Sequence, residues 1–102
     1  MTDPRNKHTR RDGNEREIID ALEAAGCFVQ QMSATAGFDD LVIYQGAVFI
    51  VEIKQPGGKL TQAEKMTQSR VIIAGGKYYI ITSVEDALEL IRMRGEYYDN
   101  QD

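Results

Sequence analysis

GFDDLVIYQGAVFIVEIKQPGG, residues 37–58, is the stretch that decides the fold of this chain. It holds two strand-like runs, Asp40–Tyr44 and Ala47–Lys54, separated by Gln45-Gly46. Glycine readily takes the positive φ that a tight hairpin turn requires. The stretch therefore predicts two antiparallel strands joined by a short turn.

Two carboxylates and one lysine lie on these predicted strands. Side chains alternate along a strand, so Glu52 and Lys54 share one face, and we expect the hairpin to fold Asp40 back toward them. Mg²⁺ is usually held by one or two carboxylates together with water and phosphate. Asp40 and Glu52 could hold such an ion, with the carbonyl of Ile53 as a third ligand. A metal there polarises a phosphodiester and acidifies a water, and Lys54 orients that water or stabilises the developing charge.

The alternative is that Glu52 and Lys54 form a solvated charge pair on an exposed strand, as is common in antiparallel sheets. We favour the functional interpretation because residues 47–53 form a nearly unbroken apolar run, typical of a strand buried on both faces. A carboxylate inside such a run must be paired or bound to a metal. The pattern thus indicates phosphodiester hydrolysis.

The composition limits the organisation of the chain. Its 102 residues are 42% hydrophobic and 27% charged, which suits one small domain. The single cysteine, Cys27, excludes an internal disulfide and is expected to be a small buried hydrophobe. We expect a flexible basic arm at 1–11, a folded domain at 12–95 and a flexible acidic tail at 96–102. No run is long and apolar enough to span a membrane, so the chain is expected to be cytoplasmic.

The net charge of −4 does not by itself favour a nucleic-acid partner, but the charges are unevenly distributed. Residues 53–80 carry five basic side chains against Glu64 alone, while acidic residues gather after residue 84. Carboxylates that bind a metal also lower the local charge until the cation arrives. Composition is therefore uninformative about DNA.

The remaining elements follow from periodicity and caps. Apolar residues at helical spacing and a closing glycine predict the first helix, and Thr61 with Glu64 forms a capping-box pattern that opens the second. The order is αβββαβα. Because a strand, helix and strand in series form a right-handed crossover, the fourth strand should lie parallel to the third, in a mixed four-stranded sheet flanked by helices. The predicted elements outside the hairpin are helix 14–25, strand 27–32, helix 61–74, strand 77–82 and helix 83–94.

This arrangement resembles the PD-(D/E)XK nuclease superfamily, and more specifically the virus-type replication and repair nuclease (VRR-NUC) domain. The motifs that carry the resemblance span residues 14–91. The resemblance implies an α/β, restriction-endonuclease-like core. The matching runs are Gly37–Ile43, Ile50–Lys54, Pro56–Thr61 and Ser83–Leu88.

The resemblance also implies roles for four residues. Asp40 and Glu52 would bind Mg²⁺ or Mn²⁺, Lys54 would assist the attacking water, and a glutamate of the first helix would complete the metal site. Glu15 is the best match for that glutamate, because Asn14-Glu15-Arg16 resembles the start of the archaeal Holliday junction resolvases.

Three points stay open. Glu15 could instead close a capping box with Asp12, in which case Glu17 is the next candidate. The family has proline before the metal-binding aspartate, whereas this chain has Asp39, which leaves the choice between Asp39 and Asp40. The family often carries glutamine at the position of Glu64, and Gln62 or Gln68 could supply the missing amide. The predicted DNA-binding residues are Arg10, Arg11, Lys59, Gln62, Lys65 and Gln68.

The leading hypothesis is a Mg²⁺-dependent DNA endonuclease that recognises branched DNA such as Holliday junctions, in a bacterial host or encoded by a phage. Cutting two opposed strands needs two active sites, so we expect a homodimer, with Tyr78–Ile81 or the helix around Leu88, Leu90 and Ile91 as its surface. The alternatives are a nicking or flap nuclease within a larger complex, and a non-catalytic DNA-binding module of the same fold.

Overall fold

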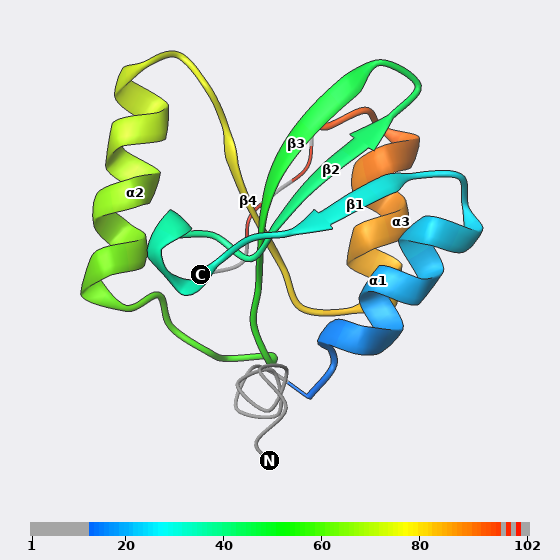
Figure 1. Ribbon diagram of the computed structural model, residues 1–102, viewed down its shortest axis with the longest axis horizontal. Helices are drawn as coiled ribbons and strands as arrows, with labels where there is room; N and C mark the ends of the chain where they lie inside the picture. The colour runs from blue at the N-terminus through cyan, green and yellow to red at the C-terminus, as the bar shows by residue number, and fades with distance from the viewer. Residues whose placement is uncertain (1–12, 97, 99, 101–102) are drawn as a thin grey trace.

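A mixed four-stranded sheet with helices on both faces forms in the predicted order αβββαβα (Figure 1). The computed structural model describes residues 13–96, 98 and 100. The strands pair in the order β1-β2-β3-β4, and β4 runs parallel to β3 as predicted. The elements are α1 (Glu15–Ala24), β1 (Phe28–Gln31), the 3₁₀ helix η2 (Ala34–Ala36), β2 (Asp40–Tyr44), β3 (Ala47–Ile53), α2 (Gln62–Ile73), β4 (Tyr78–Ile81) and α3 (Val84–Arg92).

The turn between β2 and β3 determines which residues face each other across the hairpin. Gln45 and Gly46 both have positive φ, 49° and 83°, as a two-residue hairpin turn requires. Tyr44 therefore pairs with Ala47, and the register runs on to Asp40 opposite Val51. Directly paired residues share a face of the sheet.

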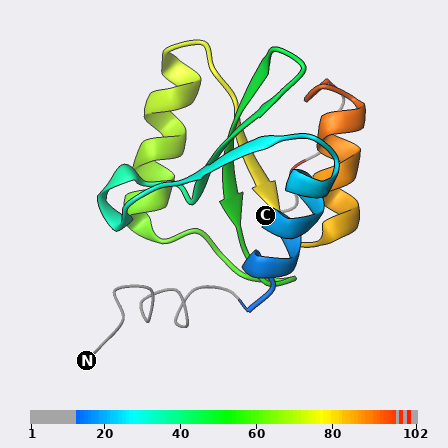
Figure 2. The same ribbon diagram turned by 45° about the vertical axis from the view of Figure 1, so that its right-hand side comes forward.

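One face of the sheet packs against α1 and α3, which lie side by side in Figures 1 and 2. This face holds the larger apolar core, in which helix residues such as Leu22 and Leu90 meet strand residues such as Val51. Phe49 and Tyr79 add an edge-to-face ring contact with centroids 5.7 Å apart. Burial of this surface is the main source of stability.

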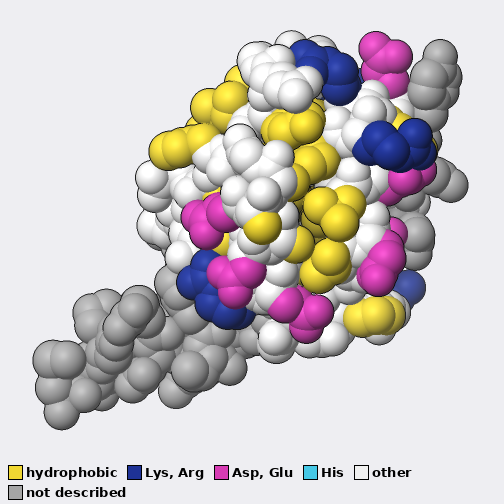
Figure 3. Space-filling model, turned by 90° about the vertical axis from the view of Figure 1, so that its right-hand side faces the viewer, with side chains coloured by type: hydrophobic (Ala, Val, Ile, Leu, Met, Phe, Trp, Pro, Cys, Tyr) yellow, Lys and Arg dark blue, Asp and Glu magenta, His cyan; other side chains and the backbone are white. Residues whose placement is uncertain are grey.

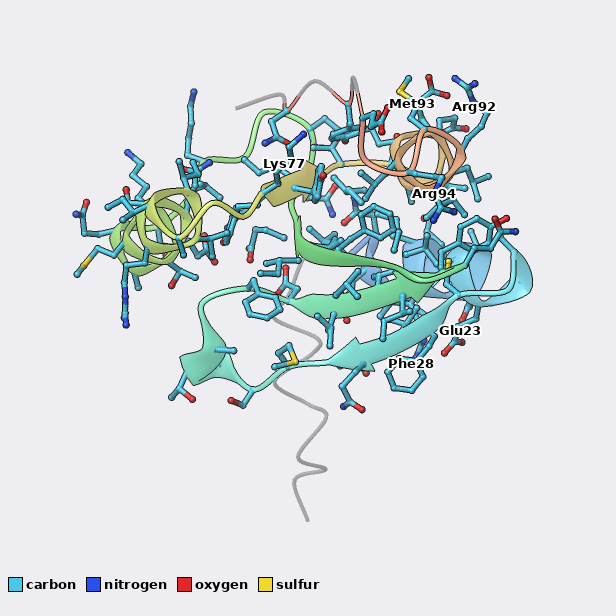
Figure 4. All side chains as sticks on the ribbon, turned by 90° about the horizontal axis from the view of Figure 1, so that it is seen from above. Glu23, Phe28, Lys77, Arg92, Met93 and Arg94 are labelled. Carbon is cyan, nitrogen blue, oxygen red and sulfur yellow. The ribbon has the colours of Figure 1, made fainter. Side chains whose placement is uncertain are left out.

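The other face packs against α2 and holds a smaller apolar cluster of Leu60, Tyr78 and Ile80. The helix begins with the predicted capping box between Thr61 and Glu64. None of its residues is fully buried, and Ile73 is 84% exposed. Figure 4 shows α2 on one side of the sheet and α1 with α3 on the other.

The outer edge of β4 is bound by Tyr98 and Asn100. Asn100 accepts a hydrogen bond from the Ile80 amide (2.9 Å) and donates one to the Tyr78 carbonyl (2.8 Å), and the Tyr98 hydroxyl donates to the Ile80 carbonyl (2.8 Å). Tyr98 and Asn100, which belong to the predicted tail, thus bind along this edge. Their polar groups satisfy backbone groups that an edge strand would otherwise expose.

The predicted dimer surfaces are mostly occupied by the protein's own core. All four residues of β4 are buried, as are Leu90 and Ile91, and only Leu88 is substantially exposed, at 40%. Cys27 is a buried free cysteine, as expected. The predicted arm at 1–11 lies outside the described residues. Within the described part of the chain, no helix is both long and apolar enough to cross a membrane.

Candidate functional site

The predicted site residues come from elements that meet at one end of the sheet. Asn14, the N-cap of α1, uses its side-chain amide to bridge the carbonyls of Lys54 (3.1 Å) and Thr82 (2.8 Å). These carbonyls directly follow β3 and β4. The start of α1 is therefore tied to the ends of the two parallel strands.

Glu52 and Lys54 share the face that α2 covers, as the alternation predicted. The Lys54 ammonium lies 3.6 Å from Glu52 Oε2 and 2.9 Å from Glu64 Oε1. Glu64 Oε1 also accepts the Thr61 amide at 2.8 Å, so the cap of α2 and the ion pair use the same oxygen. Glu52 is almost fully buried, at 2% exposure. The solvated charge pair considered above is thus excluded for Glu52.

Asp40 does not share that face, which corrects the placement expected from the sequence. It pairs with Val51 and lies two residues before Val42, and both valines belong to the core under α1 and α3. Asp40 itself is buried, at 1% exposure. A one-residue difference in register moves a side chain to the opposite face of a sheet, and here it separates Asp40 from Glu52.

Asp39 lies on the side of Glu52 instead. Its amide donates to the Val51 carbonyl at 3.0 Å, and its Oδ2 accepts the Ile53 amide at 2.8 Å. The negative charge of Asp39 also contributes to the raised pKa of Glu52. The contacts described above therefore join Asp39, Glu52, Lys54 and Glu64 on the α2 side.

The electrostatics of this cluster concentrate on Glu52. Burial, followed by the charges of Asp39 and Glu64, raises the pKa of Glu52 to about 9. Burial acts to raise the pKa of Glu64 as well, but contacts with Lys54 and the Thr61 amide outweigh it and lower that pKa. Among the described contacts, the Lys54 ammonium pairs with both Glu52 and Glu64, and burial favours a neutral Glu52.

Tyr78 was not anticipated as part of the site. Its hydroxyl donates to the Gly37 carbonyl at 2.7 Å and lies 3.3 Å from Glu52 Oε1. Burial and the neighbouring carboxylates raise the pKa of this phenol above its usual range. The available signal was the alternation of β4, because Tyr78 and Ile80 share the face of their β3 partners Ile50 and Glu52.

Glu15 is the first residue of α1, with Asn14 as N-cap, so it cannot be the third residue of a capping box. It is buried, at 6% exposure, whereas Glu17 is exposed. Of the two candidate glutamates, only Glu15 thus faces the interior. Its helix packs on the face that carries Asp40.

Four of the predicted DNA-binding residues lie on α2 or just before it. Lys59, Gln62 and Lys65 are exposed, and Gln68 is half-buried. Arg10 and Arg11 lie outside the described residues. The exposed side chains are available to a partner approaching from the α2 side.

No group of three histidine, cysteine, aspartate or glutamate side chains suited to holding a metal ion occurs among residues 13–96, 98 and 100. Mg²⁺, however, needs only one or two protein carboxylates, with water and phosphate oxygens filling its octahedron. Asp39 and Glu52 supply hard oxygen donors, and burial, followed by the charges of Asp39 and Glu64, raises the pKa of Glu52. The donor chemistry therefore fits a hard divalent cation.

Among solved structures, a chain described as a "VRR_NUC domain" superposes with a TM-score of 0.65. The match covers 83% of this chain and 98% of that one, at 24% sequence identity. The chain has the VRR_NUC fold. No protein-family model matches the sequence. The curated proteins likewise contain no match. The structural likeness confirms the predicted α/β architecture and the fold to which the sequence motifs pointed.

Proposed function

We propose that the chain is a metal-dependent DNA endonuclease whose site is centred on Glu52 and Lys54. The observation that carries this proposal is the buried Glu52 carboxyl, whose pKa is raised to about 9 by burial and by Asp39 and Glu64. Keeping acidic groups together in a dry environment costs stability, and such perturbed groups gather at functional sites. The VRR_NUC fold adds support.

The proposed roles follow from where the side chains lie. Asp39 and Glu52 would hold Mg²⁺ or Mn²⁺, with the Ile53 carbonyl at the same strand end. The bound ion would polarise the phosphodiester and lower the pKa of a water. Lys54 would place its ammonium against the reacting phosphate or water, and Glu64 holds that ammonium at 2.9 Å.

Asp40 and Glu15 are the second choice of metal ligands. Both are buried at the same end of the sheet, but Asp40 and the helix of Glu15 lie on the α1 side. Asp39 therefore replaces Asp40 as the preferred metal ligand. The matched pair Asp39→Asn and Asp40→Asn tests this choice, because the two carboxylates are adjacent in sequence and lie on opposite sides of the sheet.

Surface charge favours DNA on the α2 side. The exposed basic residues of α2 and its flanking loops are Lys59, Lys65, Arg70 and Lys77. The opposite side carries many acidic side chains around a strip of apolar ones (Figure 3). Lys and Arg that neutralise phosphates release condensed counterions, so binding on the α2 side should weaken steeply with salt.

Branched DNA remains the preferred substrate in this proposal. A protomer of this size offers little surface for reading base edges, and specific DNA interfaces commonly bury about 1,000 Å² or more. Paired cuts at a junction require two sites, which a homodimer supplies. Since β4 is buried and its edge is covered, the exposed apolar residues Phe28, Val48, Met66, Ile72 and Ile73 replace the earlier candidates for the dimer surface.

The test is a cleavage assay on four-way junction, flap, single-stranded and linear duplex DNA, with Mg²⁺, Mn²⁺ or EDTA. We expect cleavage only with a divalent ion, loss of about 10³-fold or more in Glu52→Gln and Asp39→Asn, and a much smaller loss in Asp40→Asn. Equal losses in both aspartate variants would place the metal at the sheet end between the two faces. Cleavage by the wild type in EDTA, without a divalent ion, would contradict the proposal.

A non-catalytic DNA-binding module is the second candidate. Such a module would bind the same DNA structures with the same salt dependence and cut none of them. The assay above separates the two functions.

A further inference from the structure

Tyr78 contacts two segments, and the proposed metal site depends on their relative position. Its hydroxyl lies 2.7 Å from the Gly37 carbonyl, two residues before Asp39, and 3.3 Å from Glu52 Oε1. A phenol has one proton, and the shorter distance assigns it to the Gly37 carbonyl. The longer contact with Glu52 Oε1 is then a weaker share of the same hydroxyl's donation.

Gly37 is confined from the other side as well. It has φ of +85° and ends η2, and a Cβ at this position would clash with the Thr67 hydroxyl oxygen of α2. The segment leading to Asp39 is thus held between β4 and α2, and only glycine fits there.

The carboxylate of Asp39 depends on this segment for its position. Only Phe38 separates it from Gly37, and its Oδ2 accepts the Ile53 amide at 2.8 Å, beside the carboxyl of Glu52. Any movement of Gly37 away from β4 would shift Asp39 relative to Glu52. Residues that orient ligands in this way commonly affect metal affinity or activity by about 10–100-fold.

We propose that Tyr78 is a positioning residue that sets the spacing of the Asp39 and Glu52 carboxylates by clamping the Gly37 carbonyl. This inference rests on the proposed function for its link to the metal. The clamp itself is a property of the protein alone and can be measured without metal or DNA.

The chain contains a matched control. Tyr79, the next residue, donates its hydroxyl to the carbonyl of Gly95, which also has positive φ and follows a helix. It does so on the opposite face of the sheet, in the core under α1 and α3. Removing either hydroxyl deletes a hydrogen bond to a glycine carbonyl, 2.7 Å long for Tyr78 and 3.3 Å for Tyr79, but only Tyr78 touches the proposed site.

The experiment compares Tyr78→Phe and Tyr79→Phe with the wild type in three measurements. Amide hydrogen exchange of the metal-free proteins reports on the Ile53 N–H, which donates to Asp39. Mn²⁺ titration without DNA, followed by electron paramagnetic resonance, reports on ion affinity. Junction cleavage against Mg²⁺ concentration reports on turnover. For Tyr78→Phe we expect about 10-fold faster exchange at Ile53 and about 10-fold weaker Mn²⁺ binding, with a matching shift in the Mg²⁺ requirement.

For Tyr79→Phe we expect all three measurements to stay near wild type once exchange is corrected for global unfolding. If Ile53 exchanges alike in both variants, or if Tyr78→Phe binds Mn²⁺ as the wild type does, the positioning role is overturned. If the wild type neither binds Mn²⁺ nor cleaves DNA, the proposed function fails. In that case, amide exchange at Ile53 alone tests whether Tyr78 holds the Gly37 segment in place.

Discussion

The two faces of the sheet differ in how their helices are held. Under α1 and α3, apolar side chains from both helices and three strands make a continuous core. Under α2, a few apolar residues adjoin a buried carboxyl and two ion pairs, and the helix buries no residue completely. Alternation along β3 sends Val51 and Ile53 to the first face and Glu52 to the second. The apolar core under α1 and α3 supplies most of the stability, whereas the buried carboxyl of Glu52 under α2 lowers it.

The largest expected effect on stability comes from the α1 and α3 face. Leu90→Ala leaves a cavity in a fully buried position and should lower the free energy of unfolding by about 3–4 kcal/mol. Ile73→Ala on the outer side of α2 is the control, and it should change that free energy by about 0.5 kcal/mol or less. Chemical denaturation measures both. Similar losses in the two variants would show that α2 buries Ile73 against a partner.

The second prediction is a gain in stability, on the α2 face. The pKa of Glu52 is about 9 in the folded protein and near 4.5 in the unfolded chain, so the folded state holds a proton that the unfolded state releases. Stability therefore falls as the pH rises through this window. Glu52→Gln keeps the shape, removes the cost and should raise the melting temperature at pH 8 by several degrees, since 1 kcal/mol corresponds to about 4–8 °C.

The control for this variant is Glu23→Gln, because Glu23 is exposed on α1. Thermal unfolding of metal-free protein between pH 5 and 9 makes the comparison. We expect the melting temperatures of wild type and Glu52→Gln to converge near pH 5 and diverge above it. A constant difference across this range would contradict a buried, proton-holding Glu52.

The smallest effect concerns the helix caps. Thr61 caps α2 and Ser83 caps α3, each accepting the amide of the residue three positions on. Replacing either with alanine should cost about 1 kcal/mol. Because α2 has little apolar contact with the sheet, Thr61→Ala should speed amide exchange in α2 alone, whereas Ser83→Ala should lower global stability. Residue-resolved exchange tells these apart, and a global loss in Thr61→Ala would show that α2 unfolds with the core.

Local patterns predicted the fold well because most of the elements carry their own signals. The two-residue turn at Gln45-Gly46, the capping box at Thr61 and the crossover to β4 each depend on a few neighbouring residues. The combination of an Asp-containing strand with Glu52-x-Lys54 then narrowed the architecture to one fold.

The candidate site was harder to predict because it depends on register and on distant contacts. The two-residue turn already implied that Asp40 faces Val51, but the motif drew attention to Asp40 over Asp39. The contact of Tyr78 with Gly37 spans 41 residues and exists only after β4 joins β3. No local pattern in an apolar strand distinguishes such a tyrosine from ordinary core.

Asn100 makes the β4 edge behave as though a further strand were present. Its side-chain amide accepts from the Ile80 N–H and donates to the Tyr78 carbonyl, which are the two exchanges a neighbouring backbone residue would make. An apolar, flat edge strand left bare is a template for intermolecular pairing and aggregation. We therefore expect Asn100, together with Tyr98, to protect this edge from intermolecular pairing, and protein shortened to end at Glu96 should remain foldable yet form fibrous or amorphous aggregates at concentrations where the longer chain stays dispersed.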